Sequence, residues 1–111
     1  MPNVKIEEIA PEAKLNTSPA SAATTVVSSV PSSGSAVTLI SATASRSFFM
    51  IYNDSTESLY VKFGTGASTA DFTVKILAGG YFESASPIYT GLVSGIWSAE
   101  NGNALVTELT E

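Results

Sequence analysis

The 111-residue sequence contains no cysteine and no histidine. Without cysteine the chain has no disulfide, no thiol nucleophile and no thiolate ligand for a metal. Without histidine it lacks the side chain that most often serves as a general base near neutral pH and that most often binds zinc. These two absences argue against most hydrolases and against structural zinc sites, so we expect a protein that is not an enzyme and has no cofactor.

Positive charge is also scarce. Five Lys and Arg residues are outnumbered by ten Asp and Glu residues, which gives a formal net charge of −5. A nucleic-acid partner would require a basic cluster to neutralise phosphates, so we expect no nucleic acid. No apolar run is long enough for a signal peptide or for a helix across a bilayer, so we expect no membrane and synthesis in the cytosol.

What the sequence does contain is many Ser, Thr, Ala and Gly residues and short apolar runs, a composition suited to short strands. The segment SLYVKFG (58–64) alternates apolar and polar residues most clearly, with the period of two that a strand requires. Further strands are predicted at residues 24–30, 35–40, 47–53, 71–77, 81–83, 92–98 and 104–109. Seven or eight short strands at about ten-residue spacing predict an all-β protein, either an antiparallel β-sandwich or a jelly roll.

Two local features of this pattern give specific expectations. In the segment 71–77 the alternation predicts that Phe72 faces the core together with Val74 and Ile76. Asn101 and Gly102 separate the last two predicted strands, and Asn-Gly between alternating runs is a strong signal for a β-hairpin.

Residues 1–23 differ in composition from the rest. Pro2, Pro11 and Pro19 prevent a long helix there, and residues 14–23 are too polar and too small to bury enough surface to order themselves. We therefore predict an N-terminal arm over residues 1–23, extended or disordered alone, followed by a β-sandwich domain over 24–111. The alternative for the arm is an edge strand folded onto the same domain.

The predicted strand 47–53 is apolar on both faces. Phe49 and Ile51 are expected to face the core, while Phe48, Met50 and Tyr52 face outward, where a sandwich is normally solvated. Three large apolar side chains on that face require a cover, which is either the N-terminal arm or another subunit. The alternative is a strand bent so that both of its faces enter one core.

Candidate catalytic and ligand-binding groups are few. A glycosidase requires two carboxylates in a cleft, and a serine or threonine nucleophile would need a lysine as its base. Asp54 and Glu57 are available for a calcium site, although turn stabilisation by Asn53 and Asp54 is the simpler account. Four aromatic residues are available for a sugar-stacking platform, although a tryptophan within a strand more often packs in a core or an interface. The carboxylates are Asp71, Glu83, Glu100 and Glu108, the lysines are Lys62 and Lys75, and the aromatic residues are Tyr60, Tyr81, Tyr89 and Trp97.

From about Thr24 to Thr110 the chain carries the ordered motifs IYNDS, LYVKFG, DFTVKI, GGYFE, YTG, GIW and VTEL. This series resembles a small β domain of structural proteins from tailed bacteriophages and prophages. The resemblance implies a non-enzymatic virion protein on the phage capsid surface, assembled in the host cytoplasm. The expected function is that of a capsid decoration, or cement, protein that binds the lattice of the major capsid protein and stabilises the head. The alternative is a neck, tail or fibre module with host carbohydrate as a further ligand.

The resemblance also implies a homo-oligomer, with a trimer favoured. We predict that the outward side chains of strand 47–53 mediate this self-association, and that apolar side chains of the arm contact the capsid. The self-association residues are Phe48, Met50 and Tyr52, with Trp97 as a further anchor, and the arm residues are Val4, Ile6 and Ile9.

Overall fold

The structure is a computed structural model that describes residues 21–111. This part of the chain forms eight strands and no helix, and therefore no helix that could cross a membrane. The strands are β1 (Thr24–Pro31), β2 (Val37–Ile40), β3 (Arg46–Asp54), β4 (Leu59–Phe63), β5 (Val74–Ile76), β6 (Tyr81–Glu83), β7 (Val93–Trp97) and β8 (Asn103–Thr110).

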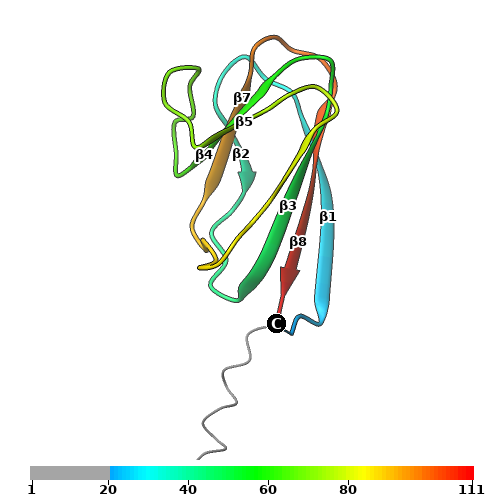
Figure 1. Cartoon of the computed structure of the whole chain (residues 1–111), viewed down its shortest axis with the longest axis vertical. Helices are drawn as coiled ribbons and strands as arrows, with labels where there is room; N and C mark the ends of the chain where they lie inside the picture. Colours follow the sequence, from blue (N-terminus) through cyan, green and yellow to red (C-terminus); the bar gives the residue numbers. More distant parts are fainter. Residues whose placement is uncertain (1–20) are drawn as a thin grey trace, which may run out of the picture.

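The strands form two four-stranded antiparallel sheets, in the orders β1-β8-β3-β6 and β2-β7-β4-β5. Within the first sheet β1 pairs with β8 and β3 with β6, and within the second β2 pairs with β7 and β4 with β5. The chain is thus one long hairpin whose strand pairs are divided between two sheets, which is a jelly roll. Figure 1 shows β1, β8 and β3 side by side in one layer and the strands of the other sheet beside them. The all-β sandwich predicted from the sequence is confirmed.

The hairpin predicted at Asn101 and Gly102 is wrong. The two strands that flank this turn, β7 and β8, lie in different sheets and do not pair with each other. Gly102 still makes a tight turn with a φ of +71°, and a Cβ added there would overlap the backbone oxygen of Asp54. The turn therefore carries the chain from one sheet to the other.

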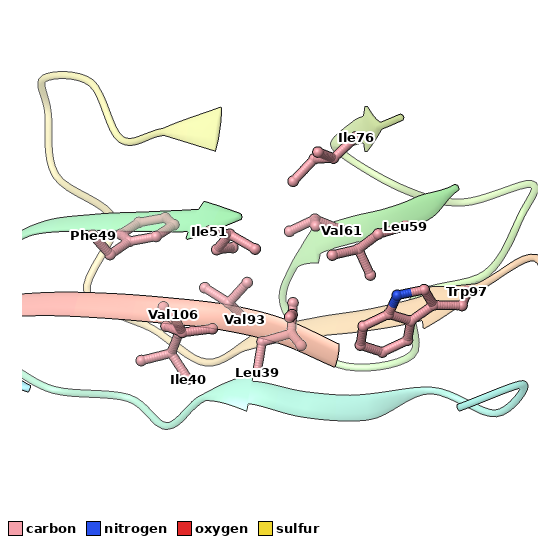
Figure 2. Close-up of a cluster of buried hydrophobic side chains, with 11 residues drawn as sticks. Leu39, Ile40, Phe49, Ile51, Leu59, Val61, Ile76, Val93, Trp97 and Val106 are labelled. Atoms are coloured by element: carbon pink, nitrogen blue, oxygen red, sulfur yellow. The ribbon is translucent and has the colours of Figure 1, made fainter. Parts of the chain in front are cut away.

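The core fills the space between the two sheets (Figure 2). Its largest fully buried apolar side chains come from β3 in one sheet and from β4 and β7 in the other. Full burial of a side chain of this size contributes roughly 1.5–3 kcal/mol relative to exposure, so this group is a major favourable contribution to folding. The side chains are Phe49, Ile51, Leu59, Val61, Val93 and Trp97.

The strand predicted over residues 71–77 is shorter in the structure, where β5 begins at Val74. Phe72 is 40% exposed and packs edge-on against Tyr60, with 5.0 Å between the ring centroids. The prediction that Phe72 faces the core is therefore wrong. The alternation does not reach back to residue 72 because Asp71 makes backbone hydrogen bonds with Ser68, so the chain turns before the strand begins.

Arg46, at the start of β3, is buried and ties the first sheet to two loops. Its Nε donates to Oε2 of Glu108 at 2.8 Å, and its Nη2 donates to the carbonyl of Ser41 at 2.7 Å. Its Nη1 donates to the carbonyls of Tyr89 and Gly91 at 2.6 and 3.1 Å. These four hydrogen bonds, one of which is also an ion pair with Glu108, compensate the cost of burying this charge.

Asn53, at the other end of β3, is a second buried polar residue with no exposed surface. Its Nδ2 donates to the carbonyls of Glu57 at 2.7 Å and Ile76 at 2.9 Å, while its Oδ1 accepts a hydrogen bond from Ser55. The side chain therefore joins β3 to β5, which belongs to the other sheet, and to the loop that precedes β4.

Candidate interaction surface

The outer face of the sheet β1-β8-β3-β6 carries apolar side chains on all four strands, interspersed with polar residues that include Thr107 and Glu83. Residues directly opposite each other in an antiparallel pair point to the same face, so the register assigns each side chain to a face. The seven apolar residues on the outward side form what we call the outer apolar face. They are Val27 of β1, Phe48, Met50 and Tyr52 of β3, Tyr81 of β6, and Leu105 and Leu109 of β8.

The register brings these side chains into rows that cross several strands. Tyr52 lies between Leu105 on one side and Tyr81 on the other, and Phe48 lies beside Leu109. Val27 is 65% exposed and Tyr81 is 63% exposed, whereas Leu105 and Tyr52 are 37% and 36% exposed. Contiguous apolar surface of this kind marks an interaction site on a folded protein.

Phe48, Met50 and Tyr52 point outward, as the alternation predicted. Phe49 and Ile51, which alternate with them, are fully buried on the inner side. The strand therefore does not bend both of its faces into one core. Neighbouring strands leave Phe48 and Met50 half-buried and Tyr52 exposed, and their role in self-association stays a prediction.

Trp97 does not lie on the surface, as its predicted role in self-association requires. It is 1% exposed and lies in the core, where its Nε1 has no hydrogen-bond partner among residues 21–111. Its strand, β7, lies between β2 and β4 in the second sheet, and the side chain points toward the first sheet (Figure 2). The prediction that Trp97 anchors self-association is therefore corrected, because a core side chain offers no surface to a partner.

The predicted capsid contacts Val4, Ile6 and Ile9 lie outside the described residues. The chain enters the domain at Thr24, which lies opposite Thr110 on the neighbouring strand. The start of β1 and the C-terminus are therefore at the same end of the sandwich (Figure 1).

The acidic residues considered for catalysis are dispersed. Asp71 forms an ion pair with Lys62 at 2.7 Å on the second sheet, whereas Glu108 is bound to Arg46 in the first. The carboxylate of Glu57, which was considered for a calcium site, accepts a hydrogen bond from Ser98. Within residues 21–111, no group of three or more acidic side chains is arranged to hold a metal ion.

The four aromatic residues considered as a sugar platform do not share one surface. Tyr89 stacks on Phe63 with 4.9 Å between the ring centroids, and its hydroxyl donates to the carbonyl of Leu92. Tyr60 and Tyr81 belong to different sheets, and Trp97 is in the core. The arrangement therefore does not supply a single stacking platform for a sugar.

A pocket of about 330 Å³ lies between the start of β3 and the segment 84–88, with Arg46, Phe48 and Glu111 among its lining residues. Arg46 has five N–H donors, and four of its hydrogen bonds are made within the protein. Its guanidinium is therefore largely committed to the fold and has little donor capacity left for an anionic ligand in the pocket.

Comparisons of the chain with models of protein families, with curated proteins and with solved structures found no match. The outer apolar face is thus the feature of the described residues that points most directly to a function.

Sequence reasoning found only the β3 members of this face. Val27, Leu105, Leu109 and Tyr81 were missed as members because face membership depends on which strands are neighbours. The alternation in residues 104–109 did separate Leu105 and Leu109 from the inward residues of β8, and this signal could have identified them once the strand order was known.

Proposed function

We propose that this chain is a non-enzymatic structural protein of a bacteriophage virion, a capsid decoration protein that binds the lattice of the major capsid protein and stabilises the head. The observation that carries this proposal is the outer apolar face. A surface of seven apolar side chains across four strands favours association with another protein over solvation. The assignment of that association to a virion comes from the motif series, which resembles a domain of phage structural proteins.

The fold supports the proposal only in a general way. Jelly rolls occur in viral capsid proteins and in lectins, and one fold hosts many unrelated functions. The fold is therefore compatible both with a decoration protein and with a glycan-binding tail module. The dispersal of Tyr60, Tyr81, Tyr89 and Trp97 favours the decoration protein, because a sugar-binding module presents its aromatic residues on one surface.

Stabilisation of the head follows from added contact area. Each large apolar side chain that becomes fully buried at an interface contributes roughly 1.5–3 kcal/mol, from which the costs of association must be subtracted. A trimer, which the resemblance favours, would cover Phe48, Met50 and Tyr52 between its subunits. Contacts of Val4, Ile6 and Ile9 with the capsid would then hold the trimer across the boundaries between capsomers.

The first test is the copy number of the chain in purified virions, measured by quantitative mass spectrometry. Hundreds of copies would place it on the shell, as the proposal requires. A number that matches one ring of subunits would instead indicate the neck or tail, and only a few copies would indicate fibres. Absence from the virion would overturn the proposal.

The second test is binding of the full-length chain to undecorated heads. Tyr52→Lys places a charge in the middle of the outer apolar face, and we expect it to lower the affinity at least about tenfold, equivalent to 1.4 kcal/mol. Leu77→Lys is the matched control, because Leu77 is an exposed apolar residue of the turn between β5 and β6 and is not part of the outer apolar face. Equal occupancy for both variants would contradict a role of the face in decoration.

A further inference from the structure

The four edges of the two sheets are protected very differently. The edges formed by β5 and β6 are three residues long, and β2 has four residues and a register shift. Short edge strands and irregular pairing are devices by which proteins prevent unwanted strand addition. The fourth edge, β1, has eight residues, the sequence TTVVSSVP and regular pairing along its whole length. It carries no charged side chain.

The backbone groups of β1 that point away from the sheet can be identified from the register. Ser32 donates to the carbonyl of Gly102, and β1 and β8 continue the same antiparallel pairing from there. Because hydrogen-bonded pairs alternate in an antiparallel ladder, Thr24, Val26, Ser28 and Val30 bond to β8. The N–H and C=O groups of Thr25, Val27 and Ser29, which lie between them, point to the side on which no strand of residues 21–111 pairs with β1.

We propose that the β1 edge is a self-association site, at which β1 of a second copy pairs antiparallel about a two-fold axis at Val27. In this register Val27 lies opposite Val27 of the second copy, and Thr25 lies opposite Ser29. All three outward residues then fall in hydrogen-bonded pairs, which gives about six backbone hydrogen bonds. Pro31, which has no N–H, lies opposite Ala23, beyond the three pairs that supply these hydrogen bonds.

The surroundings of β1 favour a second copy as the partner. The described part of the chain is acidic, yet the neighbouring strand β8 has a single charged residue, Glu108, which faces inward and is paired with Arg46. Two copies therefore meet at this edge without repulsion between like charges. The two-fold axis is perpendicular to the sheet, so the outer apolar faces of both copies lie on the same side of one continuous sheet.

The inner side of β1 also leaves room for a partner. Val26 points inward but is 49% exposed, because the second sheet packs over β8 rather than over the start of β1. Val26 and Val27 thus expose apolar surface on both faces of the same edge. One strand pair buries less area than the roughly 1,200–2,000 Å² of a stable interface, so the dimer is expected to be weak and dependent on concentration.

The register is tested with single cysteines in the full-length chain, which has none of its own. Hydrogen-bonded antiparallel partners have Cα atoms about 5.5 Å apart, within the roughly 4.4–6.8 Å that a disulfide spans. Val27→Cys should therefore form a disulfide-linked dimer under mild oxidation. Thr25→Cys is the matched control, because its two copies would be more than about 13 Å apart and should form no disulfide-linked dimer. Equal cross-linking of both variants would overturn the register.

The edge itself is tested by sedimentation of the full-length chain over a wide concentration range. The measurement uses the Tyr52→Lys background, in which a charge opposes association through the outer apolar face. We expect the average mass of Tyr52→Lys to rise toward twice that of the monomer. The double variant with Val27→Pro, which removes an outward N–H without breaking a bond to β8, should stay monomeric. Val27→Thr keeps the N–H and in the same background should associate like Tyr52→Lys alone. If Val27→Pro disturbs the strand signal in circular dichroism, the two cysteine variants decide.

A Tyr52→Lys chain that stays monomeric at all concentrations, with no cross-link through Val27→Cys, would overturn the proposal. So would a Val27→Pro variant that loses capsid binding while the wild type shows no dimer, because the occupant would then be a capsid strand. The inference does not rest on the proposed function: solution association tests the edge, whereas copy number in the virion tests the function.

Discussion

Replacing Asn53 with alanine would remove the buried amide that joins the two sheets. The side chain has no exposed surface, and its Nδ2 donates to the carbonyls of Glu57 and Ile76. Ser55 also donates to the Glu57 carbonyl, so that oxygen keeps a partner in the variant. The carbonyl of Ile76 loses the bond from Asn53 and keeps only its ladder bond with Leu59 of β4.

The magnitude follows from these contacts. The side chain of Asn53 makes three hydrogen bonds, and each lost bond costs about 0.5–1.5 kcal/mol. We therefore expect Asn53→Ala to lower the free energy of unfolding by roughly 2–4 kcal/mol, a large share of the 5–15 kcal/mol typical of a domain.

Urea unfolding followed by tryptophan fluorescence measures this loss directly, because Trp97 is the only tryptophan and lies in the core. Asn101→Ala is the matched control. Asn101 is exposed and accepts one hydrogen bond from the backbone of Thr56 at 3.0 Å, so its removal should cost less than about 1 kcal/mol. Equal losses in the two variants would refute the assignment of Asn53 as a buried link between sheets.

The substitution Asn53→Asp should make the free energy of unfolding depend on pH. The new carboxyl would be buried and would face the two carbonyl oxygens, so its pKa in the folded state should lie above its unfolded value. The folded state then binds more protons than the unfolded state, and the free energy of unfolding of the variant should fall as the pH rises. A stability difference from the wild type that is constant with pH would contradict this.

Two further substitutions follow from the same contacts. Arg46→Lys keeps the charge but cannot make the four hydrogen bonds of the guanidinium, so urea unfolding should show a loss of about 2–4 kcal/mol. A neutral result would mean that the hydrogen bonds of the guanidinium to the two loops are not needed. Gly102→Ala should destabilise the domain more than Gly79→Ala in the same assay. Both glycines have a positive φ, 71° and 75°, but only at Gly102 would a Cβ overlap backbone atoms, so equal losses would contradict the overlap.

The positions of the strands could be predicted from the sequence because period-two alternation is a local property. The segment 81–83 was predicted at its observed bounds, and the segment 104–109 lies within β8. The inward positions Phe49 and Ile51 were also correct, since the two sheets bury every second residue. The prediction that Phe72 faces the core failed because a turn held by Ser68 and Asp71 replaces the start of the expected strand.

The strand order could not be predicted in the same way. Asn-Gly chemistry predicts a tight turn, and Gly102 makes one, but in a jelly roll most consecutive strands belong to different sheets. Among the strands described here, only β4 and β5 are both consecutive and paired. The outer apolar face combines β3 with β8, which lie far apart in the chain, so its full extent was not available from sequence patterns.

The buried polar residues were likewise missed. Arg46 precedes an apolar run and is one of the few charged residues, so the sequence gives no reason to expect it inside. Its burial depends on Glu108, on the carbonyl of Tyr89 and on the nearby carbonyl of Ser41, and the first two lie far from Arg46 in sequence. Asn53 was interpreted as a turn residue, and its amide does reach the adjacent loop, but its bond to Ile76 crosses between sheets.

The side chains that hold the sandwich together and those of the outer apolar face are separate sets on the same strands. Phe49 and Ile51 are fully buried without help from Met50 or Tyr52, so the domain does not need its outer face covered in order to fold. Tyr52→Lys should therefore leave the urea midpoint nearly unchanged while it weakens binding to heads. If it lowered both, the outer apolar residues would belong to the stability of the domain itself, and their exposure would no longer argue for assembly.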